Sequence, residues 1–310
     1  MDTKSSKTQI LLFLFITFIL TYGVEIFLIM PMAGSMYVEQ AYLAQLLVAG
    51  VMFIPAIGAL LTRLITKEKF GKDNLMLSLN LKGNLKYYGL VWFGFALLIM
   101  LGAVLYFAIF PKQFDGDMSY AQALFAAQVQ NTGIEMSLEQ IKQVVLVQII
   151  VGIFLSPILN FVTCFGEEWG WRGFLLPKML KCFPKIPALL LCGVIWGLWH
   201  APLTIMGHNY GLGYRGFPFV GILAMCVFCI VLGTILSYVT IKTGSCVPAI
   251  IGHGTINGLA SASVYFTSLQ NPYNVFLGPM PTGLIGGAGF IALAAVLLYH
   301  LYKEEKQKNS

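Results

Sequence analysis

The sequence predicts an all-α polytopic membrane protein with about eight transmembrane helices and with both termini in the cytoplasm. Of its 310 residues, 58% are hydrophobic and only 10% are charged, whereas roughly 25% are charged in an average soluble domain. Apolar runs recur along the whole chain, and the lysines and arginines fall mainly on one side of them. These observations exclude an ordinary soluble protein.

The apolar runs are each about 18 or more residues long, enough to cross a hydrocarbon core ~30 Å thick. The first run is longer than the apolar part of a signal peptide and contains Glu25, so we interpret it as a retained span. We expect Glu25 to pair with a neighbouring helix or to lie near the outer interface. The eight runs cover approximately residues 9–30, 42–63, 87–110, 144–166, 188–207, 217–240, 247–264 and 282–301.

The basic residues predict the orientation, because they favour the cytoplasmic side of short loops. With the N-terminus inside, only Lys112, Lys142 and Arg215 of the 19 lysines and arginines fall outside. This bias predicts an even number of spans. The net charge of +6 is then explained by residues that face anionic lipid, so no nucleic-acid partner is predicted.

We expect residues 1–310 to form a single transmembrane domain, because no polar segment is long enough to bury a core of its own. The longest polar segment, 111–143, contains a predicted short helix at 120–129. Ser137 and Gln140 have the spacing of a capping box, which predicts that the fourth helix begins before its apolar run. The six cysteines lie in or near apolar runs, so we expect free buried thiols.

The segment Gly166-Glu-Glu-Trp-Gly-Trp-Arg172 places two carboxylates and an arginine directly after the fourth run. If the helix continues, adjacent residues point about 100° apart, so Glu167 and Glu168 cannot share a face. Glu168 and Arg172 are four residues apart and can pair, which leaves Glu167 free. Alternatively, this is a charged cluster at the membrane boundary, where nearby tryptophans act as interfacial anchors.

Two further motifs place polar residues inside apolar runs. Trp196-Gly-Leu-Trp-His200-Ala-Pro places a histidine near mid-membrane, where it needs a polar partner. His253 and Asn257 share one face of the seventh run, and the glycines around them let a backbone or a substrate approach closely. The alternatives are a hydrogen-bonded packing histidine and a helix-packing face with polar contacts.

We expect the three motifs to meet in one cavity open to the cytoplasm, because the fourth run ends on that side and the fifth and seventh begin there. A carboxylate and a histidine can deprotonate water, and a second histidine with an asparagine can hold an oxyanion. Alternatively, Glu167, His200 and His253 could bind a divalent metal such as zinc. The lack of an HExxH motif weakens the zinc interpretation.

The motifs carry a resemblance to a known family. GEEWGWRGFLLP resembles the EExxxR motif of the CPBP family, which comprises CAAX-protease and bacteriocin-processing (Abi) intramembrane endopeptidases. WGLWHAPL resembles its second motif, with Trp196 where phenylalanine is common, and HGTIN resembles its HxxxN motif. The resemblance covers roughly residues 145–265, which it identifies as the catalytic core.

The resemblance implies hydrolysis of peptide bonds within or beside the membrane. It gives Glu167 and His200 the role of activating water, and His253 and Asn257 the role of holding the oxyanion. Glu168, Arg172 and Trp196 would support the site. The family has been described both as metal-dependent, hence a metalloprotease, and as glutamate-dependent. The implied partners are membrane lipid and a peptide or lipidated-protein substrate, and the implied location is the bacterial cytoplasmic membrane.

Two other hypotheses stay open from the sequence. Intramembrane Glu and His residues also build relays in proton- or metal-coupled transporters, although we find no paired repeats. A non-catalytic membrane immunity or scaffold protein could retain the same residues for binding. We interpret His208 and His300 as interfacial, and we do not favour Cys164 as a nucleophile with His200, because no feature suggests an activated thiol.

Overall fold

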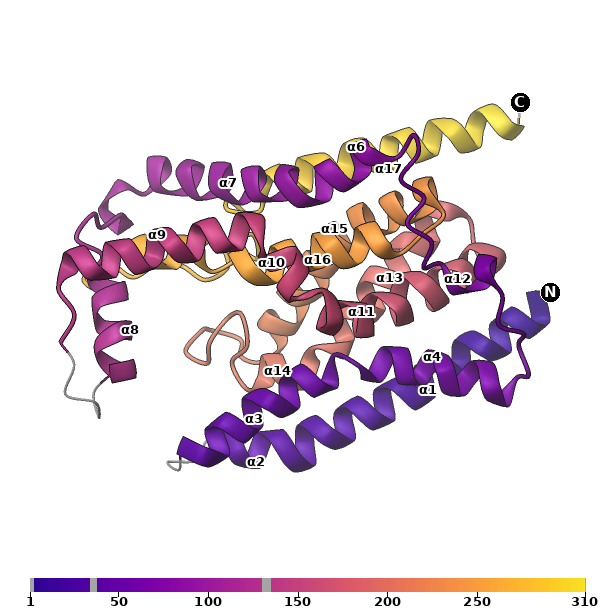
Figure 1. The fold of residues 1–310 in the computed structure, drawn as a ribbon, viewed down its shortest axis with the longest axis horizontal. Helices are drawn as coiled ribbons and strands as arrows, with labels where there is room; N and C mark the ends of the chain where they lie inside the picture. The colour runs from indigo at the N-terminus through magenta and orange to yellow at the C-terminus, as the bar shows by residue number, and fades with distance from the viewer. Residues whose placement is uncertain (1–2, 34–37, 130–134, 310) are drawn as a thin grey trace.

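The computed structural model describes residues 3–33, 38–129 and 135–309, which form helices and loops without a β-strand (Figure 1). In the first half the elements are α1 (Thr3–Val24), η1 (Glu25–Ile29), α2 (Met30–Ala33), α3 (Val38–Val51), α4 (Ile54–Ile65), α5 (Lys72–Leu75), α6 (Leu85–Gly89), η2 (Leu90–Gly94), α7 (Phe95–Ile109), η3 (Pro111–Gln113) and α8 (Ser119–Val129). In the second half they are α9 (Leu138–Phe154), α10 (Ser156–Leu159), α11 (Phe161–Gly170), η4 (Trp171–Leu175), α12 (Leu176–Cys182), α13 (Lys185–Trp199), α14 (Ala201–Ile205), α15 (Phe219–Thr243), α16 (Val247–Leu259), η5 (Ala262–Phe266) and α17 (Ala288–Asn309).

Three helical segments are long and apolar enough to cross a membrane: Thr3–Ala33, Leu85–Ile109 and Phe219–Thr243. A fourth is the pair Leu43–Val51 and Ile54–Ile65, if these helices, bent by 42°, form one span. The prediction of an all-helical membrane protein is therefore confirmed. Of the remaining predicted runs, the fourth and fifth are interrupted, and the seventh contains the 13-residue helix α16. The eighth continues into α17, an uninterrupted helix of 22 residues with a charged tail.

The fourth apolar run is not one helix, contrary to our expectation. The α-helical conformation stops at Leu155 and again at Asn160, which separates α9, α10 and α11. Pro157 in the first turn of α10 explains the first break, because proline cannot donate the hydrogen bond that would continue α9. After Asn160, α11 runs without interruption through Glu167 and Glu168, as predicted.

The fifth run is also interrupted, and the break falls on a candidate catalytic residue. Helix α13 ends at Trp199, and α14 begins at Ala201 with Pro202 in its first turn. His200 lies between them, with a backbone ψ of 0°. The proline therefore fixes the histidine at a helix junction rather than inside a continuous helix.

Two smaller predictions outside the apolar runs are confirmed. Helix α8 covers the predicted short helix at 120–129. The Ser137 hydroxyl accepts a hydrogen bond from the Gln140 backbone N–H at 3.3 Å, and the Gln140 side chain accepts one from the Ser137 N–H at 2.8 Å. This capping box starts α9 at Leu138, ahead of its apolar run.

Pairs of glycines four residues apart let the motif helices approach their neighbours closely. A Cβ on Gly166 would lie 2.5 Å from the carbonyl oxygen of Met52, and one on Gly193 would lie 2.6 Å from Cα of Ile230. A Cβ on Gly254 would lie 3.0 Å from Cα of Pro157. Each pair therefore fixes one motif helix by backbone packing, as small residues do between membrane helices. The pairs are Gly166/Gly170, Gly193/Gly197 and Gly254/Gly258.

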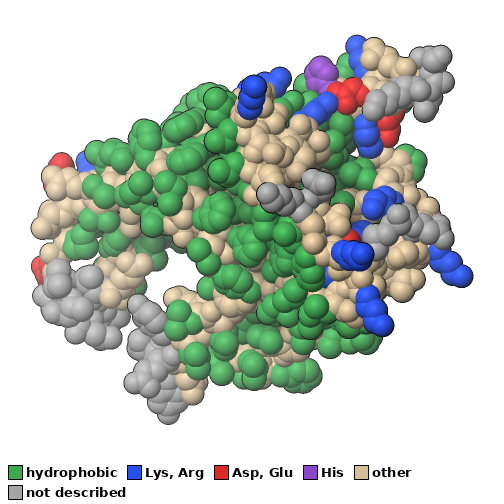
Figure 2. All heavy atoms as spheres, turned by 45° about the vertical axis from the view of Figure 1, so that its right-hand side comes forward, with side chains coloured by type: hydrophobic (Ala, Val, Ile, Leu, Met, Phe, Trp, Pro, Cys, Tyr) green, Lys and Arg blue, Asp and Glu red, His purple; other side chains and the backbone are tan. Residues whose placement is uncertain are grey.

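Both chain termini lie at the same end of the molecule (Figure 1), and most of the lysines and arginines visible in Figure 2 gather there. At this end, the backbone N–H of Lys185 donates to Glu305 at 2.9 Å, and Lys242 pairs with Glu304. We call it the basic end. It carries the start of α13, the end of α15 and the tail of α17.

A buried ion-pair network, also at the basic end, joins α1, α4 and α12. Glu68 Oε1 lies 2.6 Å from Lys178 Nζ and 3.2 Å from Arg63 Nη1, and Glu68 Oε2 accepts a hydrogen bond from Gln9 at 3.2 Å. Arg63 also donates to the Asn74 carbonyl at 2.8 Å. Because each charge has an opposite partner, burial of these groups is tolerated.

Candidate active site

The four side chains predicted to be catalytic line one cavity of about 360 Å³. Glu167 comes from α11, His200 from the α13–α14 junction, and His253 and Asn257 from α16. Glu167, His200 and His253 are 3%, 8% and 5% exposed, whereas Asn257 is open to solvent. Three motifs that lie far apart in the sequence thus meet in space.

The two adjacent glutamates occupy different environments, as helical geometry predicts. Glu167 lines the cavity, and its Oε2 accepts a hydrogen bond of 2.9 Å from Trp196 Nε1. Glu168 is fully buried and is not part of the cavity wall. Only Glu167 is therefore placed to meet a water molecule in the cavity.

Glu168 organises the buried side of the site. Its Oε1 accepts from Arg172 Nη1 at 3.0 Å, the pair predicted from the spacing, and it also receives His253 Nδ1 at 2.9 Å. The contact with His253 spans 85 residues of sequence, and sequence reasoning missed it. An Nδ1–H donated to a carboxylate fixes the orientation of the imidazole ring.

Trp196 lies at the centre of these contacts. Besides donating to Glu167, its ring lies 4.3 Å from the guanidinium carbon of Arg172, a cation–π contact. It also meets the ring of His253 at a centroid distance of 5.4 Å and an interplanar angle of 71°. A phenylalanine at this position could reproduce the ring contacts but could not donate the hydrogen bond to Glu167.

His200 is held so that one ring nitrogen stays available. Its Nδ1 lies 2.8 Å from the carbonyl oxygen of Trp196, and a carbonyl only accepts, so Nδ1 must carry the hydrogen. In the neutral ring, Nε2 then keeps its lone pair. The ring packs edge-on against Trp199 at 4.7 Å, and Trp199 Nε1 donates to Thr21 at 2.7 Å.

The buried cysteines around the cavity lack the contacts of a nucleophile. All six are free thiols. Cys164 is fully buried, outside the cavity wall, and its Sγ lies 3.5 Å from Asn257 Nδ2 rather than next to His200. Cys229 lies 3.9 Å from His200, but at Nδ1, the nitrogen already bonded to Trp196.

Sequence reasoning missed two features near the site. Glu25 is fully buried, and both of its carboxyl oxygens lack a hydrogen-bond partner among the described residues, so the expected pairing with a neighbouring helix is wrong. It lies in the π-helical turn η1, which packs against α14. His208 is exposed, and it also forms part of the cavity wall.

The metal interpretation has limited geometric support. Within the described ranges, no three His, Cys, Asp or Glu side chains come close enough together to hold a metal ion. Glu167, His200 and His253 share the cavity without forming such a cluster, and His253 Nδ1 is bonded to Glu168. We therefore derive no catalytic step through a metal.

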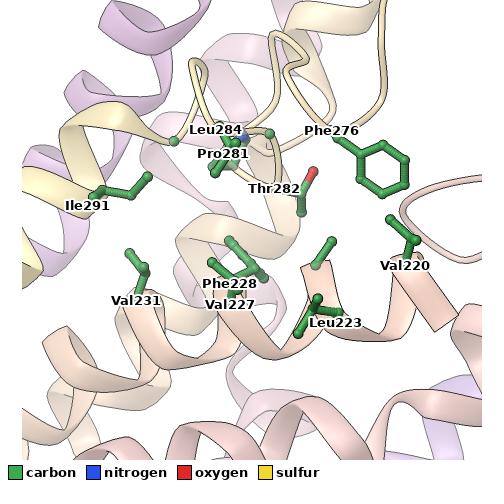
Figure 3. Close-up of a pocket in the computed structure, with 13 residues that line it drawn as sticks. Val220, Leu223, Val227, Phe228, Val231, Phe276, Pro281, Thr282, Leu284 and Ile291 are labelled. Atoms are coloured by element: carbon green, nitrogen blue, oxygen red, sulfur yellow. The ribbon is translucent and has the colours of Figure 1, made fainter.

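An apolar pocket of about 250 Å³ adjoins the cavity and shares Phe228 and Thr282 with it. Figure 3 shows Val220, Leu223, Val227 and Val231 of α15 on one side, and Pro281 and Leu284 on the other. Leu223 and Leu284 are 65% and 53% exposed. Because no ionisable residue lines its wall, this pocket can bind apolar groups but offers no side chain for acid–base catalysis.

The cavity wall lies away from the basic end, and the side of the membrane to which the cavity opens stays a prediction. Its wall includes His208 and Asn209 after α14, Ala260 and Ser261 after α16, and Met280 and Thr282. Helices α13 and α16 both begin at the basic end, and these residues follow their far ends. His200 directly follows the end of α13, His253 lies at the middle of α16, and Asn257 lies near the end of α16.

Comparison with known proteins agrees with the motifs. The sequence model of the family described as "Type II CAAX prenyl endopeptidase Rce1-like" matches residues 144–259. This range begins in α9, contains all three motifs and ends with α16. Residues 144–259 are an Rce1-like domain of the CPBP family.

A curated relative supports the same assignment. The chain is 31% identical to CAAX prenyl protease 2 of Methanococcus maripaludis over 99 residues. The match covers 29% of this chain and 34% of the relative, so it spans about a third of that protein's length. The resemblance to the CPBP family is thereby confirmed for the Rce1-like domain.

Proposed function

We propose that this protein is an intramembrane endopeptidase that hydrolyses peptide bonds of membrane-associated substrates. The observation that carries the proposal is that Glu167, His200, His253 and Asn257 line one cavity. The Rce1-like match supports the reaction class. In this proposal, the protein crosses the bacterial cytoplasmic membrane about eight times and has both termini in the cytoplasm.

In the proposed mechanism, Glu167 accepts a proton from a water molecule whose second hydrogen is held by Nε2 of His200. The resulting hydroxide attacks the carbonyl carbon of the peptide bond. The proton on Glu167 then passes to the leaving nitrogen as the C–N bond breaks. General-base catalysis of this kind contributes roughly 10² to 10⁴ in rate.

The oxyanion of the tetrahedral intermediate would be held by His253 and Asn257. His253 has its Nδ1 on Glu168, so a protonated ring directs Nε2–H towards the cavity. The Asn257 side-chain amide supplies a second donor. Glu168 and Arg172 act through His253 and Trp196, and they position the reacting groups rather than touch the substrate.

The apolar pocket beside the cavity supports a membrane-associated substrate. It shares Phe228 and Thr282 with the cavity and opens onto exposed apolar side chains of α15. The relative is named CAAX prenyl protease 2, so prenylated peptides are the first substrates to test. Bacteriocin precursors and signalling peptides are the next.

Cleavage by the purified protein in detergent tests the proposal. A panel of prenylated and unmodified membrane-associated peptides is incubated with wild type, Glu167→Gln and His200→Ala. The exposed Glu139 lies outside the cavity, so Glu139→Gln is a matched control. We expect cleavage by wild type and by the control, and its loss in the two site variants. Unchanged cleavage in both site variants would contradict the proposed catalytic roles of Glu167 and His200.

We also expect activity to survive removal of divalent metal, because the proposed steps use only side chains and water. Incubation with a chelator followed by metal analysis and a cleavage assay checks this. One stoichiometric zinc, lost together with activity and restored with it, would contradict the prediction.

A further inference from the structure

We propose that a hollow between α9 and α16 binds the backbone of the peptide substrate next to the bond to be cleaved, and that Gln148 is a positioning residue for that backbone. The inference deepens the proposed function and rests on it for the substrate being a peptide. The hollow has a volume of about 280 Å³, and its wall comes mainly from α9, α10, α16 and η5. We call it the α9–α16 hollow.

The α9–α16 hollow adjoins the catalytic cavity. Ser261 lines both of them. Gly258, in the wall of the hollow, directly follows Asn257, in the wall of the cavity. A peptide chain whose carbonyl is held by Asn257 therefore has the hollow as a neighbouring binding surface.

Gln148 is a polar residue in an apolar part of α9. Among residues 144–154, it has the only side chain that forms conventional hydrogen bonds. Gln148 is exposed, and so are the nearby Leu146 and Ile150. An amide among exposed apolar side chains gains little from packing, and in the membrane it costs free energy unless it is hydrogen-bonded. Its position therefore calls for a partner outside the fold.

Three residues in the wall of the hollow have polar side chains without a hydrogen bond to another described residue: Gln148, Ser261 and Tyr265. The ring of Tyr265 stacks on Phe125 of α8 at a centroid distance of 6.2 Å, a contact that does not use its hydroxyl. Ser156 differs, because its hydroxyl donates to the Gly254 carbonyl at 2.9 Å. The hollow thus offers one amide and two hydroxyl groups to a ligand.

An extended peptide has the groups that these side chains lack. A segment held open for cleavage loses the hydrogen bonds of a helix, and each N–H and C=O that leaves water needs a new partner. The Gln148 amide carries both donors and an acceptor, so it can bond to an N–H and a C=O of one extended segment. The apolar pocket beside α15 has a single polar side chain, Thr282. The hollow is therefore better suited than that pocket to a peptide backbone.

Peptide binding to a protein that does not cleave tests the proposal. The probes are two fluorescein-labelled peptides of one sequence, one S-farnesylated and one unmodified. Their Kd is measured by fluorescence anisotropy in detergent, with Glu167→Gln alone and with Glu167→Gln combined with Gln148→Leu. Gln143 is also exposed in α9 but lies outside the hollow, so Gln143→Leu in the same background is the matched control.

We expect Gln148→Leu to raise the Kd of at least one probe by roughly two-fold to ten-fold, as the loss of one ordinary hydrogen bond does. Gln143→Leu should leave Kd unchanged, and both variants should unfold at the temperature of their parent. An unchanged Kd in Gln148→Leu, an equal rise in Gln143→Leu, or no binding of either probe overturns the proposal. A lower unfolding temperature in Gln148→Leu alone would show a structural role and also overturns it.

Methylation of single backbone nitrogens in the probe identifies the bonded group. At the nitrogen whose hydrogen Gln148 accepts, methylation should weaken binding to the parent but add no further loss in Gln148→Leu, because the two changes remove one hydrogen bond. Additive losses at every nitrogen overturn recognition of the backbone. Because the protein used does not cleave, a failed cleavage assay leaves this result standing. Cleavage by wild type together with an unchanged Kd in Gln148→Leu overturns this inference alone.

Discussion

The basic end and the cavity bury charged groups in opposite ways. At the basic end, Glu68 meets both Arg63 and Lys178, so buried charge is balanced by opposite charge. In the cavity, Glu167 is held by a neutral indole N–H, and the nearby Glu25 lacks a hydrogen-bond partner among the described residues. The contrast separates buried charge that stabilises the fold from buried charge left available for reaction.

The largest effect on stability is expected from Glu68→Gln. It would leave Arg63 and Lys178 buried without their shared carboxylate, and breaking a buried pair typically costs about 3–5 kcal/mol. Thermal unfolding in detergent measures the loss. The partly exposed pair of Lys242 and Glu304 provides the control, because Glu304→Gln should change stability by less than about 1 kcal/mol. Equal effects of the two variants would show that burial of the Glu68 ion pairs does not increase their contribution to stability.

The next largest effect is expected on catalysis, from Asn257→Ala. Loss of one oxyanion donor typically lowers kcat by roughly 10² to 10³. A steady-state cleavage assay measures it. Asn209 also lines the cavity, where its amide contacts Met225 Sδ at 3.5 Å, so Asn209→Ala is the matched control and should retain most of the activity. A larger loss of activity in Asn209→Ala than in Asn257→Ala would indicate that the oxyanion is bound by Asn209 instead.

A smaller effect is expected from Trp196→Phe, which keeps the ring but removes the donor to Glu167. A hydrogen bond to a charged group is worth about 1.5–3 kcal/mol, so cleavage should slow by roughly ten-fold to 150-fold. Trp199→Phe removes an indole N–H that bonds to Thr21 instead and should slow cleavage less. If the two variants behave alike, Trp196 acts through packing rather than by positioning Glu167.

Much of the fold and site could be predicted from local sequence patterns. The capping box at Ser137 and Gln140, the ion pair of Glu168 with Arg172, and the different directions of the two glutamates all depend on residues within one or two helical turns. Helical spacing is enough to predict such contacts.

The features that were missed depend on distant or backbone contacts. The bond from His253 to Glu168 crosses 85 residues and joins two motifs that have no local relation. The helix breaks at Leu155 and His200 were signalled by Pro157 and Pro202, which hydropathy alone passes over. The position of the cavity along the helices depends on how far along each helix the motif residue lies. That position became clear only once the helix ends were known.

Glu167 is thus buried in a position to react, whereas Glu68 is buried in ion pairs that stabilise the fold. The most direct test measures cleavage rate and thermal unfolding together for Glu167→Gln and Glu68→Gln in the same detergent. We predict that Glu167→Gln slows cleavage by at least about 100-fold while unfolding like wild type, and that Glu68→Gln unfolds at a markedly lower temperature. Wild-type cleavage by Glu167→Gln, or greater destabilisation in that variant than in Glu68→Gln, would contradict these roles of the two glutamates.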